Sequence, residues 1–392
     1  MFSPLYFSIA EIVLLLITTV PFIDVDLSPL SRSARLTIVH RMTVWRNLLA
    51  PFVNPRVEGM DPDSKALEEM MMLFYPQLAL SHNITADEVK VFRKQAKHMF
   101  TNLYPSRPST CVVQGHVFQH NGNSVKIYFI QHNKLDDWED VDTPLILYLH
   151  GGGFVFGDID LYDGVECDLS KRMNMLVIHV AFDLAPEHTV DKILVDITDV
   201  YQTLLYIDPN IHQRLIGMGD SSGGMLWIYL LQWMISNNIS VPQGIVLHSP
   251  WPNLNFDYID YSTRPMIYLT IDMMFKFRQL AIGEGKIWSN LSHEEKQKYS
   301  PIDGLYQGFP PLYITAGTRD ICINEVYHMT DLAVNQGVQI TLRVLEGMMH
   351  AYPLFHLWSA KAQCVQEDIH RWIKEKLHKF PLDTQSNLYK FC

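Results

Sequence analysis

The chain is poor in charge, and the charge that it carries is mostly negative. Charged residues make up 19% of its 392 residues, with 31 Lys and Arg against 42 Asp and Glu, so the formal net charge is −11. A chain with this charge has no general electrostatic attraction to nucleic acid or to anionic membranes, which argues against nucleic-acid binding. The apolar fraction of 48% predicts a large buried core and argues against disorder.

Cysteines and metal-binding motifs are scarce as well. The five cysteines are scattered, odd in number and form no C-x-x-C pair, so neither a zinc cage nor a disulfide scaffold is expected. None of the 17 histidines forms an H-E-x-x-H motif, so we predict no metal ion. The cysteines are Cys111, Cys167, Cys322, Cys364 and Cys392.

A single apolar run approaches the length of a membrane span. It extends from Leu5 to Ile23, 19 residues with Glu11 as their only charge, and as a helix it would be about 28 Å long. No lysine or arginine precedes it and no A-x-A-like site follows, so a cleaved signal peptide is not expected. Two interpretations stay open: a retained anchor, which would place the protein at a membrane, and an apolar arm packed on a cytoplasmic domain.

Short apolar runs alternate with helix-like stretches over most of the chain. This alternation is typical of a mainly parallel sheet that helices cover on both faces, an α/β fold. Two earlier runs, 112–120 and 125–131, flank an Asn-Gly-Asn turn and predict an antiparallel hairpin. The runs predicted as further strands are 145–149, 176–181, 215–218, 245–247, 312–315 and 340–345.

These patterns suggest one large domain with additions at both ends. Residues 1–55 form the apolar N-terminal extension, and residues 56–110 have only helical patterns and are predicted to form a cap. The α/β domain is expected over 111–380, followed by a tail, 381–392. Within that domain, residues from about 251 to 300 are aromatic and helix-like, which predicts a second cap segment inserted over the sheet.

Glycine marks the expected functional region. Seven of the 20 glycines fall within 151–153 and 217–224, and both stretches follow predicted strands. Ligands of open α/β sheets bind where parallel strands end, so these are functional positions. Neither stretch contains G-K-[ST], and the second is spaced one residue too widely for G-x-G-x-x-G. We therefore expect neither a nucleotide nor another cofactor.

The second stretch contains a G-x-S-x-G motif with Ser221 at its centre. It reads Gly219-Asp220-Ser221-Ser222-Gly223 and lies between a predicted strand and a predicted helix. In this context the serine occupies a sharp, strained turn, and flanking glycines prevent collisions with the neighbouring strand and helix. Ser221 is thus the candidate nucleophile.

The first stretch, His150-Gly151-Gly152-Gly153-Phe154, follows the strand predicted at 145–149. Its glycines leave backbone N–H groups uncovered, and acyl transfer creates an oxyanion that needs such preorganised donors. The stretch is therefore predicted to form an oxyanion loop.

A base and an acid follow in the chain order Ser, acid, His. Asp320 follows the predicted strand 312–315, and His350 follows the predicted strand 340–345. His350 would accept the proton of Ser221, while Asp320 would orient its ring and stabilise the imidazolium. Glu325 and Asp331 are alternative acids, although both fall within the next predicted helix.

With these motifs the sequence resembles the hormone-sensitive-lipase-like or arylacetamide-deacetylase-like esterases of the α/β-hydrolase superfamily. The resemblance covers roughly residues 56–380 and rests on HGGGF, on GDSSG, on Leu-Ala-Pro-Glu-His at 184–188 and on the spaced Asp320 and His350. It implies the α/β-hydrolase fold with a helical cap. It also implies that Gly152, Gly153 and Ser222 donate N–H groups to the oxyanion, that Gly151 keeps the loop thin, and that His150, Gly219, Asp220 and Gly223 support the two motifs.

The chain departs from the family pattern at several positions. Asp183 stands where the family usually has arginine, and Thr189 replaces a proline, so the support of the loops is expected to differ. Ile321 and Cys322 replace the usual Pro-Leu after the acid, and Ser222 replaces a common alanine but keeps its backbone N–H.

The sequence thus predicts a serine hydrolase that cleaves carboxylic esters of small to medium apolar substrates through an acyl-serine intermediate, without a cofactor. A ligand-binding receptor on the same fold that has lost catalysis is one alternative, and a serine peptidase or amide deacetylase is another. The oligomeric state does not follow from the sequence.

Overall fold

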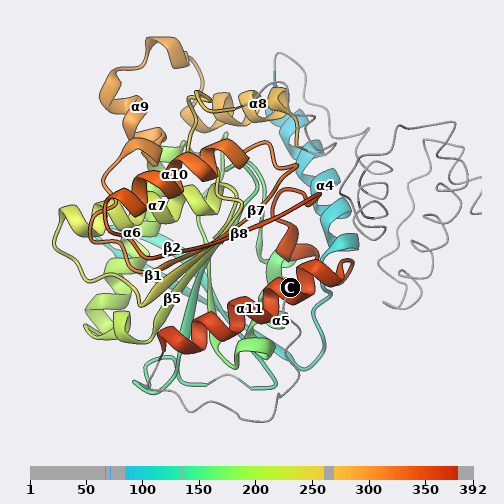
Figure 1. Cartoon of the computed structure of the whole chain (residues 1–392), viewed down its shortest axis with the longest axis vertical. Coiled ribbons are helices and arrows are strands. Elements are labelled where there is room, and N and C mark those ends of the chain that lie inside the picture. Colours follow the sequence, from blue (N-terminus) through green and yellow to red (C-terminus); the bar gives the residue numbers. More distant parts are fainter. Residues whose placement is uncertain (1–66, 68–70, 72–83, 135, 260–268, 378–392) are drawn as a thin grey trace, which may run out of the picture.

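The computed structural model describes residues 84–377, apart from residue 135 and residues 260–268, together with Leu67 and Met71 (Figure 1). The predicted anchor or arm, nearly half of the predicted N-terminal cap and the tail lie outside the described residues. Within the described part, no helix has the length and apolarity that a transmembrane span requires.

The centre of the molecule is an eight-stranded sheet in the order β1-β2-β4-β3-β5-β6-β7-β8. The hairpin β1-β2 pairs antiparallel, β2 joins β4 antiparallel, and the remaining neighbours are parallel. The strands are β1 (Cys111–His120), β2 (Asn123–His132), β3 (Leu145–Leu149), β4 (Leu176–Ala181), β5 (Leu215–Asp220), β6 (Gly244–His248), β7 (Leu312–Gly317) and β8 (Ile340–Leu345). The predicted hairpin and mainly parallel sheet are confirmed.

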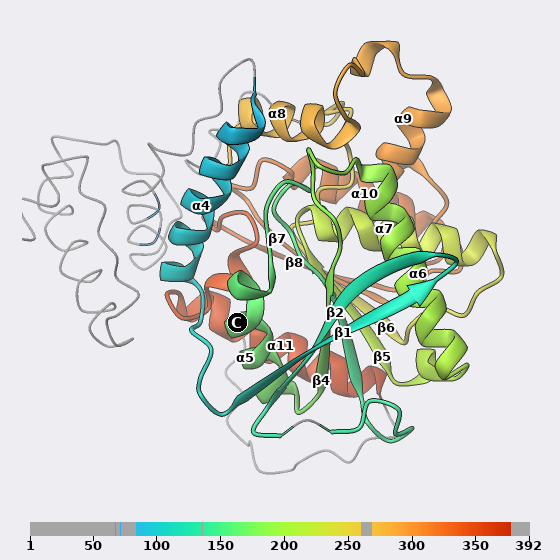
Figure 2. The ribbon, with the colours of Figure 1, turned by 180° about the vertical axis from the view of Figure 1, so that it is seen from behind.

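Helices cover both faces of this sheet (Figures 1 and 2). Helices α5 and α11 pack on one face, whereas α6, α7 and α10 pack on the other. Strands β3, β5, β6 and β7 are buried along their whole length, which explains why they are continuous apolar runs rather than alternating ones. The main helices are α4 (Ala86–Leu103), α5 (Ile159–Met173), α6 (Val190–Ile207), α7 (Ser222–Ser236), α8 (Ile271–Ile282), α9 (His293–Tyr299), α10 (Ile323–Asn335) and α11 (Ala360–Lys376).

Two helices from distant parts of the chain form the described part of the cap. Helix α4 begins at a capping box in which Thr85 and Glu88 exchange hydrogen bonds. Helix α8 lies in the long connection between β6 and β7, together with α9. The rings of Phe92 on α4 and Phe277 on α8 are 5.6 Å apart, so the two helices meet over the sheet (Figures 1 and 2).

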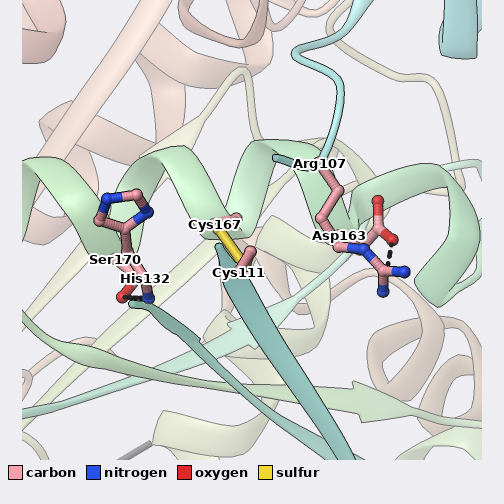
Figure 3. The surroundings of a disulfide bond; sticks show 6 residues. All are labelled: Arg107, Cys111, His132, Asp163, Cys167 and Ser170. Atoms are coloured by element: carbon pink, nitrogen blue, oxygen red, sulfur yellow. Dashed lines mark hydrogen bonds and ion pairs between the residues drawn. A yellow bond between two sulfur atoms is a disulfide. The ribbon is translucent and has the colours of Figure 1, made fainter. Parts of the chain in front are cut away.

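A disulfide joins the start of the sheet to helix α5. Cys111, the first residue of β1, is bonded to Cys167 of α5, 56 residues away in the sequence (Figure 3). Cys364 is also disulfide-bonded, whereas Cys322 is free and buried. The prediction that the fold has no disulfides was therefore wrong. Cysteine spacing along the chain does not reveal which helix packs over which strand, and this packing brings the two sulfur atoms together.

Polar contacts flank the disulfide on both sides (Figure 3). Arg107 pairs with Asp163 at 3.2 Å, and the hydroxyl of Ser170 accepts a hydrogen bond from the backbone N–H of His132. Helix α5 is thus held by covalent and polar links to the open end of the hairpin, where β1 begins and β2 ends.

Candidate active site

Ser221 lies on the sharp turn between β5 and α7, where the sequence places the nucleophile. Its φ and ψ are 51° and −119°, a conformation that is strained for a residue with a side chain. A Cβ atom at Gly219 would lie 2.8 Å from the carbonyl oxygen of Leu149, and one at Gly223 would lie 2.0 Å from it. Both flanking positions therefore require glycine, because β3 passes too close for any side chain.

The glycine loop follows β3 and lies against the same turn. Gly152 and Gly153 have positive φ values of 107° and 62°. A Cβ on Gly152 would come within 1.9 Å of the carbonyl oxygen of Phe156, and one on Gly151 would come within 2.2 Å of the Asp220 carboxylate. The absence of side chains lets the backbone approach Asp220, the residue before Ser221, closely enough for the Gly151 N–H to donate to it.

His350 and Asp320 form a buried pair behind the turn. The Nδ1 atom of His350 lies 2.8 Å from Oδ1 of Asp320, and the backbone N–H of Cys322 donates to the same oxygen at 2.9 Å. Asp320 is fully buried. Of the alternative acids, Glu325 is buried in the first turn of α10 and Asp331 is exposed. The histidine pairs with Asp320.

One cavity brings these groups together beneath the cap. Ser221, His350, Asp220, Gly152 and Gly153 line its floor. Its walls are mostly apolar side chains of α4, α8 and the loops, namely Phe92, Ala96, Met99, Phe100, Tyr104, Phe156, Trp251, Leu269, Met273, Phe277 and Phe355. A cavity with one polar face and apolar walls is typical of a site for a small apolar ligand.

Comparison with known proteins agrees with this geometry. A family model described as alpha/beta hydrolase fold matches residues 146–354, more than half of the chain. The chain belongs to the alpha/beta hydrolase family. It is 28% identical over 229 residues to an esterase of Acinetobacter venetianus, covering 58% of this chain and 73% of that one. It is 26% identical over 240 residues to the putative acetyl-hydrolase LipR of Mycobacterium tuberculosis, covering 60% and 74%.

A solved structure has the same fold. The crystal structure of an esterase from the bacterial hormone-sensitive lipase family superposes on this alpha/beta hydrolase with a TM-score of 0.68, at 20% identity, covering 81% of this chain and 99% of that one. Together with the family model and the esterase relatives, this confirms the family resemblance that the motifs indicate.

Two tyrosines that the sequence does not single out hold the motif residue Asp220. The Tyr148 hydroxyl donates to Oδ1 at 2.9 Å, and the Tyr162 hydroxyl donates to Oδ2 at 3.0 Å. The backbone N–H of Gly151 also donates to Oδ1, at 3.1 Å. Burial raises the pKa of Asp220 to about 6, although these hydrogen bonds oppose the rise. Asp220 thus links the turn at Ser221 to the glycine loop.

His150 fixes the start of the glycine loop. Its Nδ1 atom lies 2.7 Å from the carbonyl oxygen of Gly151, and its ring stacks on Phe182 with centroids 4.2 Å apart. The His150 ring also stacks on His179, which pairs with the buried Glu166 at 2.7 Å. Burial lowers the pKa of His150 to about 3, so the ring is neutral and serves to position the loop.

An arginine of the cap also supports the loop. Arg93 of α4 donates to the carbonyl oxygens of Val155 at 2.6 Å and Ala185 at 2.7 Å, and its guanidinium holds the Glu187 carboxylate through two nitrogens. Asp183, which replaces the family's arginine, instead lies 3.4 Å from Lys192. The cation that joins the two loops therefore comes from the cap. No sequence motif marks Arg93, because its partners lie more than 60 residues away.

Proposed function

We propose that this alpha/beta hydrolase cleaves carboxylic esters with Ser221 as nucleophile, His350 as base and Asp320 as the acid that orients the base. The observation that carries the proposal is the shared cavity, in which a serine on a strained turn, a histidine paired with a buried aspartate and a glycine backbone without side chains meet. The esterase and acetyl-hydrolase relatives support the reaction class.

The proposed chemistry proceeds through an acyl-enzyme. The Ser221 oxygen attacks the ester carbonyl carbon while its proton passes to His350, and the N–H groups of Gly152, Gly153 and Ser222 stabilise the oxyanion. His350 then protonates the departing alcohol, leaving the acyl group on Ser221. A water molecule, deprotonated by His350, attacks the acyl-serine and releases the carboxylic acid. Asp320 stabilises the imidazolium in both halves of the reaction.

The cavity favours small, apolar acyl groups. Its free volume is about 60 Å³, and the rings of Phe100 and Phe156 stack within it at 5.7 Å. This space accommodates a short acyl chain, whereas a longer chain requires the cap side chains to move. One methylene changes the discrimination between two substrates by only about 1–3 kcal/mol. We therefore expect activity to decline gradually with acyl length rather than to stop at a fixed length.

The proposal is tested with aryl esters of increasing acyl length, assayed on the wild type and on Ser221→Ala. We expect turnover of the short and medium esters and a loss of several powers of ten in Ser221→Ala, because removal of one triad member leaves only the oxyanion donors and binding. Ser236→Ala is the matched control, since Ser236 lies at the other end of the same helix.

The same assay separates the alternatives. A receptor would bind an ester or a product without hydrolysing it, so equal rates for the wild type and Ser221→Ala would refute the esterase proposal. Anilides of the same acyl groups test the amide deacetylase and peptidase alternatives. Hydrolysis of the anilides faster than of the matched esters would favour these.

For residues 5–23 we propose membrane association. Large apolar side chains dominate this segment, and each stabilises insertion by a few tenths of a kcal/mol. Deletion of residues 1–23 is expected to move the protein from the membrane fraction to the soluble fraction while ester cleavage persists. Full-length protein that is soluble without detergent, together with a truncated form that unfolds, would contradict this.

A further inference from the structure

Cys322 lies beside the proposed base and acid. One ligand atom from each of Asp320, Cys322 and His350 lies within 4.8 Å of the others, and all three residues are buried. Cys322 is the free cysteine of the described residues. It stands where the family pattern usually has an apolar leucine, so this thiol is a distinctive property of the chain.

A buried carboxylate oxygen beside the thiol has no donor. The Oδ2 atom of Asp320 is buried and has no hydrogen-bond partner among the described residues. Glu325, one turn further along α10, is also buried and interacts with the Cys322 thiol and the Asn253 amide, and burial raises the pKa of its carboxyl well above the usual range. An unsatisfied buried acceptor is rare in proteins and calls for an explanation. A bound cation would supply one for Asp320.

We propose that Asp320, Cys322 and His350 form an inhibitory site for a thiophilic divalent cation, such as Zn²⁺ or Cd²⁺. A thiolate, an imidazole nitrogen and a carboxylate oxygen are the ligands that zinc prefers, with bond lengths of about 2.0–2.3 Å. Small movements of the three side chains bring atoms within 4.8 Å of one another to this geometry. His350 also lines the substrate cavity, which gives the cation a route from solvent.

Binding of the cation changes two protonation states and removes the base. The Cys322 thiol releases its proton to solvent, so that thiolate and carboxylate together balance the two positive charges. The cation takes the place of the proton between Nδ1 of His350 and Asp320. A neutral ring that is metal-bound at Nδ1 carries its hydrogen on Nε2, and such a ring cannot accept the proton of Ser221. The site is therefore inhibitory and is distinct from a cofactor of the reaction.

Metal binding is measured first, on full-length Ser221→Ala protein, so that the result does not depend on the proposed function. Addition of Cd²⁺ is expected to produce the ultraviolet charge-transfer absorption of a cadmium thiolate. The absorption should be lost in the double variants that also carry Cys322→Ser or Cys322→Leu. Mg²⁺, a hard cation, should produce none. Equal cadmium absorption with and without the Cys322 thiol would overturn the proposal.

Inhibition is measured next, and this arm rests on the proposed esterase function. Zn²⁺ is titrated into the wild type, Cys322→Ser and Cys322→Leu, with each rate normalised to that of the same protein in chelator. Mutating a residue that only hydrogen-bonds to a metal ligand typically lowers metal affinity by about 10–100-fold. Loss of the Cys322 ligand itself is expected to raise the half-inhibitory Zn²⁺ concentration by about as much or more. The two variants differ in size, so a folding defect in one leaves the other informative. Unchanged sensitivity in both would overturn the inhibitory role.

Discussion

Replacing Asp220 by asparagine is expected to make the protein more stable and less active at neutral pH. Asparagine has the shape of aspartate, and its Oδ1 can keep the hydrogen bonds from Tyr148 and Gly151. Its Nδ2 group can donate to the Tyr162 hydroxyl, which now donates to Oδ2 at 3.0 Å. The substitution therefore removes a buried negative charge with little loss of hydrogen bonding.

The magnitude follows from the raised pKa of this carboxyl. Burial raises it from 3.8 to about 6 in the folded protein, a difference equivalent to about 3 kcal/mol. Because the folded state holds the proton more tightly, the ionised carboxylate destabilises the fold. Stability falls as the pH rises from about 4 to about 6, and the full cost is present at pH 7. The Asp220→Asn variant lacks this cost.

Activity is expected to change in the opposite direction. The negative charge of Asp220 attracts a positive charge on His350, and the asparagine variant lacks this attraction. We expect kcat/KM of Asp220→Asn to fall by about 10-fold, less than for the loss of an oxyanion donor. The fall should be largest above pH 6, because the wild-type carboxyl is itself neutral below that pH.

The assay is urea unfolding of both proteins at pH 4 and pH 7, with kcat/KM measured at several pH values. The stability advantage of the variant should grow by about 2–3 kcal/mol between the two pH values. A difference in unfolding free energy that does not depend on pH would refute the reasoning, since Asp220 would then not change its protonation state over this range.

Three further predictions concern the cap, the glycine loop and the disulfide. Arg93→Lys keeps the charge but not the planar fork, so it should lower kcat/KM about as much as Arg93→Ala, by roughly 10-fold, and full activity in the lysine variant would contradict this. Gly153→Ala should lower kcat by about 10²–10³-fold, because Gly153 has a positive φ and an added Cβ would lie 2.2 Å from the ring of Phe277 in the cap. The control is Gly285→Ala, which should retain activity, because Gly285 also has a positive φ but an added Cβ would meet no atom within 4 Å. Replacing both Cys111 and Cys167 by alanine should lower the unfolding free energy by up to about 4 kcal/mol, the chain-entropy value for a loop of this length, and an unchanged urea midpoint would count against that role.

The parts of the site that are contiguous in sequence were predictable, because their chemistry is local. The glycines at 151–153 and around Ser221 directly follow predicted strands, where an oxyanion loop and a sharp serine turn both need residues without side chains. The order Ser, acid, His then selects Asp320 and His350, which the structure pairs at 2.8 Å.

The supporting residues were not predictable, because their partners are distant in the chain. Tyr148 belongs to a fully buried apolar strand, and nothing in the sequence indicates that its hydroxyl binds Asp220 rather than its ring simply filling the core. The Cys111–Cys167 pair has the same character, since only the packing of α5 over the hairpin brings it together. The presence of Asp183 in place of the family's arginine indicated that these loops are held differently. It did not indicate that the replacing cation is Arg93 on α4.

The attachment of α4 bears on how substrate enters. This helix is tied down along its length, by Arg93 to two loop carbonyls, by Lys97 to the carboxylates at the start of α5 at 2.7 and 2.9 Å, and by the Leu103 carbonyl to an indole N–H. Tilting α4 outward would break all of these polar contacts and would pull on the glycine loop through the Val155 carbonyl. We therefore expect α4 to stay fixed when a large ester enters, so that the glycine loop keeps its geometry during each round of entry and release.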